Sequence, residues 1–275
     1  MQPYKLSLPL NQTNCVLFNS PHSGSIYTDK FMQLTDLSLR TLRSSEDLFV
    51  DQLFSPVVGL GSLMLSAKFP RSFIDLNRDC EELDPLLIED LIAYKDTLKV
   101  SAGLGVIPRV VADQRPIYNH RLSIDDANER LQGFYFPYHD KLKSLIKQTE
   151  ASFKKVILLD CHSMPLSSVN LVSKKDPVEV VLGDCFGRSC EHEIVVELKT
   201  LLTEVGFKVS LNNPFSGGFI TKNYASPQNN INVVQIEILR SLYSHENQQI
   251  KNNEFSKIQK RLIDVIEEFI KRFAD

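Results

Sequence analysis

The sequence predicts one α/β domain over residues 1–275, with a mostly parallel or mixed central sheet between two helical layers, a three-layer α/β/α arrangement. Short apolar runs bounded by turn residues alternate with longer stretches of helical periodicity, which is typical of this class. Several runs, such as residues 156–159, are apolar at every position, as expected of central strands covered on both faces. The length suffices for one sizeable core, and no repeat or linker divides the chain.

Seven strands are predicted from apolar runs that end in turn residues, at 15–19, 62–67, 72–76, 156–160, 178–182, 207–210 and 233–238. Four helices are predicted at 37–54, 125–149, 191–205 and 247–273. The last has apolar residues at Ile258, Leu262, Val265 and Phe269, the stripe of a helix that packs on a core. In such folds active sites collect at the carboxyl ends of strands, where polar clusters follow two of the predicted strands.

Composition argues against several functional classes. A formal net charge of −3, with scattered basic residues, gives no long-range attraction to nucleic acid or to an anionic membrane. No run approaches the ~18–20 apolar residues that span a bilayer, and the first residues do not resemble a signal peptide, so the expected location is cytoplasmic. The five cysteines include no CxxC pair, and they are expected to be free thiols.

Two histidines that follow predicted strands are candidate metal ligands. His22 lies in Ser20-Pro-His-Ser-Gly after the first strand, and His162 lies in Asp160-Cys-His-Ser-Met after a central one. Imidazoles at strand ends commonly hold zinc, which takes about two or three histidines plus a carboxylate and keeps one position for water. The alternative is that both are loop histidines bonded to backbone or solvent.

A carboxylate ligand could come from Glu46 or Asp47, in Ser45-Glu-Asp-Leu-Phe-Val-Asp. Both stand beside a serine that could cap a helix. Acids in a first helical turn also complement the helix dipole and bind backbone N–H groups without any metal. The residue pattern leaves both interpretations open.

Another polar cluster lies in Phe69-Pro-Arg-Ser-Phe-Ile-Asp-Leu-Asn-Arg. If residues 72–76 form a strand, Asp75 and Asn77 share one face, and Arg71 and Arg78 lie at its two ends. Arginines at strand ends can hold a substrate carboxylate through two parallel hydrogen bonds. Surface ion pairs are the alternative for each arginine.

Glu237 lies inside an otherwise apolar predicted strand, with Gln235 on the same face. A carboxylate there must be paired, linked to a metal or shifted in its pKa, because an isolated buried charge is too costly. Glu237 is therefore the candidate general base, and a buried ion pair with an arginine is the alternative. Cysteine catalysis is disfavoured, because the adjacent Cys161 and His162 would point to opposite faces of an extended segment. The sequence also has no G-x-S-x-G nucleophile elbow.

Taken together and in chain order, the polar segments described above resemble the N-formylglutamate amidohydrolase family over most of the chain. The resemblance also includes Gly105-Val-Ile-Pro-Arg, Pro137-Tyr-His, Leu182-Gly-Asp-Cys-Phe-Gly-Arg-Ser-Cys and Val234-Gln-Ile-Glu-Ile. That family is similar to zinc carboxypeptidases and aspartoacylases. The resemblance thus implies a zinc-carboxypeptidase-like scaffold of the phosphorylase/hydrolase-like type.

The resemblance implies one zinc ion per chain, held by His22, Asp47 and His162. Zinc carboxypeptidases take a histidine and a glutamate from one H-x-x-E turn, but position 25 here is Ser25. The acidic ligand must therefore come from elsewhere. Asp47 is preferred to Glu46 because related branches keep an acid at that position.

The resemblance also implies the catalytic and substrate-binding residues. Glu237 would be the catalytic glutamate, and Asn77 and Arg78 would orient the α-carboxylate of the substrate. Arg71 would either stabilise the oxyanion or bind a side-chain carboxylate. The role of His139, in Pro137-Tyr-His, is left open.

The implied reaction is zinc-dependent hydrolysis of N-formyl-L-glutamate to formate and L-glutamate, a step in histidine degradation. The expected partner is a small acidic N-acyl amino acid; no nucleic acid or membrane is expected, and a homo-oligomer is one option. One alternative is the same metallohydrolase site acting on another N-acyl amino acid or on a C-terminal peptide residue. The other is a non-catalytic protein that binds acidic amino acids.

Overall fold

The computed structural model describes residues 2–111, 113–170 and 177–273. The chain divides into two compact units that alternate along the sequence. The first unit comprises residues 1–5, 21–46 and 66–142, and the second comprises residues 6–20, 47–65 and 143–275. The expectation of a single domain remains a prediction.

A mixed sheet forms the centre of the second unit. Two of its strands include a few residues, 4–5 and 66–67, that belong to the first unit. In the described part of the chain it has seven strands, in the order β1-β3-β2-β4-β7-β5-β6. The strands are β1 (Tyr4–Ser7), β2 (Val16–Ser20), β3 (Leu63–Ala67), β4 (Val156–Met164), β5 (Val180–Gly183), β6 (Val209–Leu211) and β7 (Ile231–Leu239). β4 runs parallel to β2 and β7, whereas β5 runs antiparallel to β7. The predicted α/β class with a mixed sheet is confirmed.

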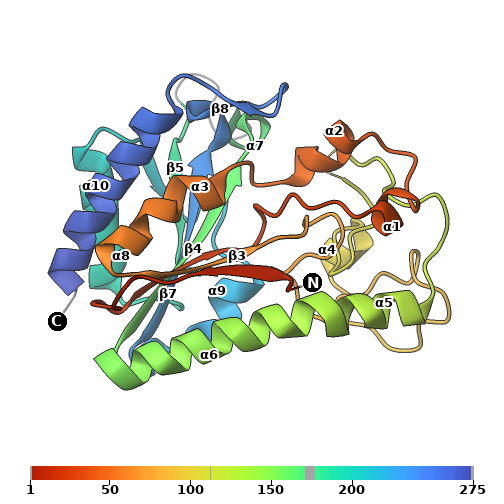
Figure 1. Ribbon diagram of the computed structural model, residues 1–275, viewed down its shortest axis with the longest axis horizontal. Coiled ribbons are helices and arrows are strands. Elements are labelled where there is room, and N and C mark those ends of the chain that lie inside the picture. The colour runs from red at the N-terminus through yellow and green to blue at the C-terminus, as the bar shows by residue number, and fades with distance from the viewer. Residues whose placement is uncertain (1, 112, 171–176, 274–275) are drawn as a thin grey trace. The chain divides into compact units, whose positions relative to one another are not determined.

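Helices cover both faces of this sheet (Figure 1). α3 (Val50–Phe54), α8 (His192–Glu204) and α10 (Phe255–Phe273) enclose the main core, together with apolar residues that alternate along β2, β4 and β7. α9 (Phe219–Tyr224) and the second half of α6 (Phe136–Phe153) lie on the other face. The predicted apolar stripe of the C-terminal helix is buried in the main core, as expected.

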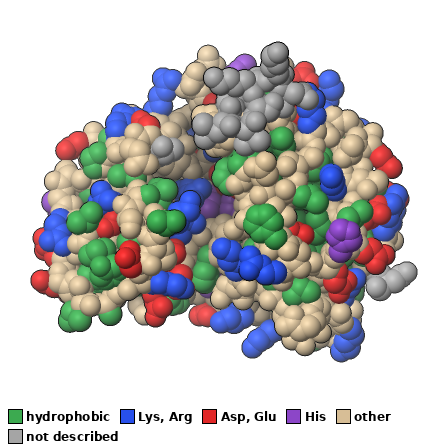
Figure 2. Space-filling model, turned by 180° about the vertical axis from the view of Figure 1, so that it is seen from behind, with side chains coloured by type: hydrophobic (Ala, Val, Ile, Leu, Met, Phe, Trp, Pro, Cys, Tyr) green, Lys and Arg blue, Asp and Glu red, His purple; other side chains and the backbone are tan. Residues whose placement is uncertain are grey.

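The rest of the second unit consists of short elements. They are the 3₁₀ helices η2 (Ser55–Leu60), η4 (Pro227–Asn229) and η5 (Arg240–Leu242), the helix α7 (Leu166–Asn170), and the hairpin of β8 (Ser244–His245) and β9 (Ile250–Lys251). Figure 2 shows Lys and Arg side chains interspersed with Asp and Glu over one face of the protein. Among the described helices, none combines the length and apolar character that a bilayer span requires.

The first unit consists of short helices and long loops. Its elements are α1 (Asp29–Met32), α2 (Leu39–Leu42), η1 (Arg43–Ser45), α4 (Leu98–Ser101), α5 (Ile124–Arg130), the π-helix η3 (Leu131–Tyr135) and the start of α6. The buried Arg130 lies among aromatic rings, 4.4 Å from the centroid of Phe73, 5.1 Å from Tyr118 and 6.0 Å from Phe31. Arg130 also donates to the Phe73 carbonyl oxygen at 3.0 Å, so it holds the segment that follows β3.

Two predicted elements are wrong, and local hydrogen bonds explain both. Residues 72–76 form turns rather than a strand, because the N–H groups of Phe73 and Ile74 donate to the Pro70 carbonyl. The predicted helix 37–54 is broken between η1 and α3, where Glu46 is extended and Phe49 is left-handed with φ 61°.

Two of the boundaries that differ from prediction have a clear structural cause. The C-terminal helix begins at Phe255 rather than at residue 247, because the hairpin β8–β9 precedes it. β4 continues four residues beyond the predicted end, since its ladder with β7 extends to the pair Met164–Leu239. His162 therefore lies inside a strand, not in a loop after it. All five cysteines are free thiols, as predicted.

Candidate active site

Polar side chains on one face of β2, β4 and β7 form two rows across the sheet. The strand register pairs Asn19 with Asp160, and Asp160 with Gln235. Two residues farther along, it pairs His162 with Glu237. Because side chains alternate along a strand, all five residues point to the same face, opposite the main core. The register thus brings two predicted site residues, His162 and Glu237, onto neighbouring strands.

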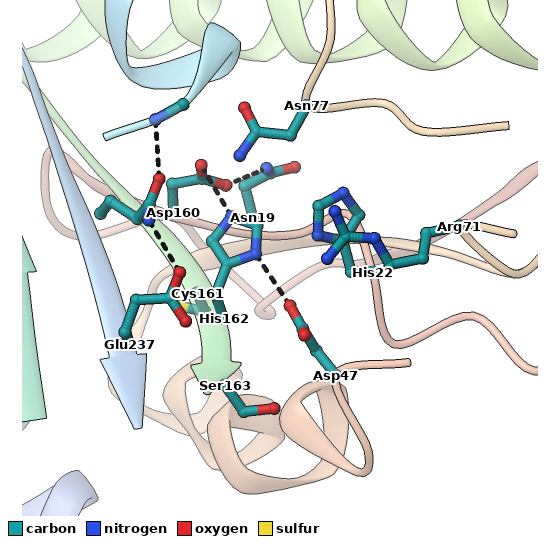
Figure 3. Close-up of polar contacts among 12 residues, drawn as sticks. Asn19, His22, Asp47, Arg71, Asn77, Asp160, Cys161, His162, Ser163 and Glu237 are labelled. Carbon is teal, nitrogen blue, oxygen red and sulfur yellow. Dashed lines mark hydrogen bonds and ion pairs between the residues drawn. The ribbon is translucent and has the colours of Figure 1, made fainter. Parts of the chain in front are cut away.

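His162 is held between two carboxylates (Figure 3). Its Nε2 donates to Asp160 Oδ2 at 3.0 Å, and its Nδ1 lies 2.8 Å from Asp47 Oδ2. Asn19 Nδ2 donates to the other Asp160 oxygen at 2.6 Å, which fixes that carboxylate. All four residues are buried. In the neutral tautomer that keeps its proton on Nε2, the lone pair lies on Nδ1 and faces Asp47.

The surroundings of His162 favour a positive charge at Nδ1. Burial by itself lowers the pKa of the imidazole, but the charge and hydrogen bond of Asp160, the hydrogen bond to Asp47 and the charge of Glu237 raise that pKa well above its usual value. A proton at Nδ1 is one charge that this site stabilises. A metal cation bound by Nδ1 and Asp47 would be another, and a carboxylate on Nε2 is the usual support of a metal-bound histidine.

Arg240 is a site residue that the sequence analysis did not single out. It follows β7 directly and is buried, with Nη2 3.7 Å from Asp47 Oδ1 and Nε donating to Ser163 Oγ at 3.3 Å. One oxygen of Asp47 thus faces His162 and the other faces a cation. The available signal was an arginine two residues after the predicted strand 233–238, which carries Glu237.

Glu237 is buried and accepts a hydrogen bond from Gln235 Nε2 at 2.8 Å. Gln235 Oε1 in turn accepts from the Gly218 N–H at 2.8 Å, which ties the pair to the residue that precedes α9. Glu237 is therefore oriented by a neighbour on its own strand face. A buried, oriented carboxylate on the strand next to His162 is a candidate general base.

Asp75 is the centre of the polar cluster in the first unit. Its Oδ1 accepts from His22 Nε2 at 2.7 Å and from the Asn77 N–H at 2.8 Å, and its Oδ2 accepts from Arg71 Nη2 at 2.7 Å. Burial acts to raise the pKa of this carboxyl, but Arg71, His22 and Arg78 outweigh it and hold the pKa well below its usual range. The sequence predicted Asp75 on a strand face beside Asn77, whereas it is a buried support for His22.

His22 repeats the pattern found at His162. The hydrogen bond to Asp75 fixes Nε2 as the donor, so the lone pair of the neutral ring lies on Nδ1. His22 comes two residues after Ser20, the last residue of β2. In both histidines a buried carboxylate thus contacts Nε2, and Nδ1 is the candidate ligand atom.

The two acidic candidates have different surroundings. Glu46 is buried and accepts from the Tyr27 hydroxyl at 2.7 Å, and Arg43 Nε contacts its two oxygens at 3.2 and 3.1 Å. Asp47 instead contacts an imidazole. These contacts give Glu46 a structural network and leave Asp47 as the acid beside a candidate metal ligand.

The predicted carboxylate-binding residues lie on a loop rather than at the ends of a strand. Arg78 Nε donates to the Leu104 carbonyl at 2.9 Å, and its Nη1 donates to the Asn77 carbonyl at 2.8 Å. Arg71 forms the ion pair with Asp75 and is a quarter exposed. The turns therefore bring both Arg71 and Arg78 close to the buried carboxylate of Asp75. A strand over residues 72–76 would have kept the two arginines apart.

The predicted site residues fall into two groups. The second unit contains Asp47, His162 and Glu237, and the first contains His22, Arg71, Asn77 and Arg78. In the second unit His162 contacts Asp47 directly and is paired in register with Glu237. In the first unit Asp75 joins His22, Arg71 and Asn77.

Comparison with known proteins identifies the family. The N-formylglutamate amidohydrolase family model matches residues 14–244. N-formylglutamate deformylases from Pseudomonas putida and Pseudomonas aeruginosa are 27% and 26% identical to this chain over 234 residues, which cover 84% of it and 82% of each relative. The crystal structure of N-formylglutamate amidohydrolase from Ralstonia eutropha JMP134 is 31% identical, with a TM-score of 0.92 over 99% of both chains.

A gene product of Agrobacterium tumefaciens, 18% identical with a TM-score of 0.71, covers 98% of this chain and 94% of its own, and it shares the fold. The family match covers most of the chain and includes every predicted site residue. The chain therefore belongs to the N-formylglutamate amidohydrolase family, whose members are amide-bond hydrolases.

Proposed function

We propose that this chain is a zinc-dependent amidohydrolase that cleaves N-formyl-L-glutamate to formate and L-glutamate, the reaction of histidine degradation. The observation that carries the metal part is His162, whose Nε2 donates to the Asp160 carboxylate while Nδ1 faces Asp47 at 2.8 Å. The substrate is inferred from the family and from the two Pseudomonas relatives, which are named N-formylglutamate deformylase.

The proposed zinc ligands are Nδ1 of His22, a carboxylate oxygen of Asp47 and Nδ1 of His162. Two imidazoles and one carboxylate are a usual catalytic zinc set, which leaves a fourth position open. Connectivity supports the inclusion of His22: it is two residues, at most about 8 Å of chain, beyond the end of β2, and β2 pairs with the strand of His162. When bound, zinc would supply Lewis acidity to the formyl carbonyl and to the attacking water.

Glu237 is the proposed general base and acid. It would take a proton from the attacking water and return it to the amide nitrogen as the C–N bond breaks. The products are formate and L-glutamate with a free amino group. The hydrogen bond from Gln235 holds one oxygen of the carboxylate, which supports transfer through the other.

The substrate proposed is a small N-acyl amino acid with two carboxylates. Asn77 and Arg78 would orient the α-carboxylate. Arg71 would bind the side-chain carboxylate or stabilise the oxyanion; a guanidinium has five N–H donors, so its ion pair with Asp75 does not preclude either role. Arg71→Ala separates the two roles. It should erase the preference for N-formyl-Glu over N-formyl-Gln in the first case, and lower kcat equally for both substrates in the second.

A substrate panel tests the proposal. The N-formyl, N-acetyl and dipeptide forms of Glu, Asp, Gln and Ala are compared with and without a chelator. N-formyl-Glu should be hydrolysed fastest, and the chelator should abolish the rate. Faster hydrolysis of an acetyl or dipeptide form would assign the same site to another substrate. If the protein binds glutamate whether or not the chelator is present and hydrolyses none of the substrates, it is a binding protein rather than an enzyme.

A further inference from the structure

Three consecutive backbone carbonyls in the loop of residues 75–78 each accept a side-chain hydrogen bond. His139 Nε2 donates to the Leu76 carbonyl at 3.0 Å, and the Tyr135 hydroxyl donates to the Arg78 carbonyl at 2.7 Å. The carbonyl between them, that of Asn77, accepts from the Arg78 guanidinium at 2.8 Å. The peptide group that precedes Asn77 and the one that follows Arg78 are thus fixed from outside the 75–78 loop, whereas the peptide between Asn77 and Arg78 is held by Arg78 itself.

Tyr135 and His139 are neighbours on one helical face. They are four residues apart, which places them one above the other, and their ring centroids are 4.2 Å apart. Both side chains are buried. Each ring therefore restricts the other, and both donors are held in place before any substrate binds.

The π-helix η3 accounts for a third contact from the same helical segment. Arg130, the last residue of α5, donates to the Phe73 carbonyl, and Tyr135 is the last residue of η3. Residues five apart lie on different faces of an uninterrupted α-helix, which has 3.6 residues per turn. The i→i+5 hydrogen bonds of a π-helix bring such residues back onto one face. One helical segment can therefore hold the backbone from Phe73 to Arg78 at three points.

We propose that Tyr135 and His139 are positioning residues that fix the 75–78 loop so that Asn77 and Arg78 meet the α-carboxylate of the substrate. This inference rests on the proposed function for the identity of the ligand. A guanidinium binds a carboxylate well only when its planar fork is correctly aimed, and Arg78 is aimed by its own backbone contacts. Movement of the Arg78 or Leu76 peptide would misdirect the fork without touching the proposed metal ligands.

Kinetics of matched variants test the positioning role. Tyr135→Phe keeps the ring and removes the hydroxyl, and His139→Leu removes the ring donor, whereas His139→Gln keeps an N–H donor of similar reach. Tyr135→Phe and His139→Leu should each raise KM for N-formyl-L-glutamate about 3- to 10-fold, the worth of one hydrogen bond, with kcat within about twofold. Zinc content should stay at the wild-type level, and His139→Gln should restore most of the loss.

Three controls separate positioning from general destabilisation. Ser189→Ala removes another buried side-chain hydrogen bond to a carbonyl, that of Val233, and should leave KM unchanged. The α-carboxamide analogue of the substrate, which lacks the α-carboxylate, should be insensitive to Tyr135→Phe. In an Arg78→Lys background, Tyr135→Phe should add less than about a twofold effect, because residues that act through one another are not additive.

Provided that the wild-type enzyme is active, the positioning role is overturned if Tyr135→Phe and His139→Leu leave KM unchanged. It is also overturned if Tyr135→Phe has its full effect on KM in the Arg78→Lys background. A wild-type protein that releases no formate would instead overturn the proposed function. Amide hydrogen exchange in a peptide that spans residues 74–79 then tests whether Tyr135 and His139 fix the loop. Faster exchange in both variants than in Ser189→Ala supports the fixed loop, and unchanged exchange refutes it.

Discussion

Replacing Asp160 with asparagine should weaken zinc binding while the sheet stays folded. Asp160 is fully buried, and its two oxygens accept separately from His162 Nε2 and Asn19 Nδ2. Asparagine has the same shape but only one acceptor oxygen, so it cannot serve both donors. If that oxygen stays with Asn19, the amide N–H faces His162 Nε2 and forces this nitrogen to accept. The ring proton then moves to Nδ1, the proposed ligand atom.

The size of the effect follows from the contact that is lost. Carboxylates that support a metal-bound histidine are typically worth 10–100-fold in metal affinity, which is about 1.4–2.8 kcal/mol. Asp160 is charged, excluded from solvent and in direct contact with the ring at 3.0 Å. We therefore expect the upper part of that range, about 30–100-fold.

Competition with a chromophoric chelator at fixed pH measures the zinc Kd of each variant. Asp184→Asn is the matched control, because Asp184 is also buried and its Oδ1 accepts from Asn212 Nδ2 at 2.6 Å, the same distance as in the Asn19–Asp160 pair. This control should lose stability but keep the wild-type Kd. The reasoning is refuted if Asp160→Asn binds zinc within about threefold of wild type, or if Asp184→Asn weakens binding as much.

Further predictions concern the base, the substrate clamp, the acidic ligand and the thiols. Glu237→Gln cannot accept a proton, so kcat should fall ~10²–10⁴-fold at unchanged zinc content; a near-normal kcat would leave Glu237 a structural role. Arg78→Lys replaces a planar fork with a point charge, so KM for every substrate with an α-carboxylate should rise about tenfold, and a change below about twofold would contradict the clamp. Elemental analysis should find about one zinc per chain in Glu46→Gln and little in Asp47→Asn, and the reverse result would exchange their roles. A thiol reagent at about pH 8 should modify Cys80 slowly and leave activity intact, because partial burial and then the nearby acids raise the pKa of Cys80 and the other four cysteines are buried. Rapid inactivation would argue for a catalytic thiol.

Sequence periodicity predicted the elements whose signal is local and strong. The strands β2, β4 and β7 are apolar runs, and α8 and α10 carry regular apolar stripes, so their burial follows from pattern alone. The segment from Phe69 to Arg78 could not be predicted in this way. Its apolar residues resemble a strand, but the Pro70 carbonyl and the Asp75 carboxylate capture the N–H groups that a ladder would need.

The candidate site was predictable where a residue's position along a strand was informative. Glu237 stood out as an acid in an apolar strand, and His162 as a histidine at the end of one. The supporting roles of Asp160, Asp75 and Arg240 were not predicted, because these roles depend on strand order and on contacts between residues far apart in sequence. The contact of Asp47 with His162 joins residues 115 positions apart.

The central claim is that a metal held by this chain drives deformylation, and a stoichiometric titration tests it most directly. Protein stripped of metal by a chelator is titrated with zinc while formate release from N-formyl-L-glutamate is followed. The rate should be negligible at first, rise linearly and reach a plateau at about one equivalent, while His162→Ala should stay inactive throughout. Full formate release from the metal-free protein, or a rise that zinc produces equally in His162→Ala, would contradict the account.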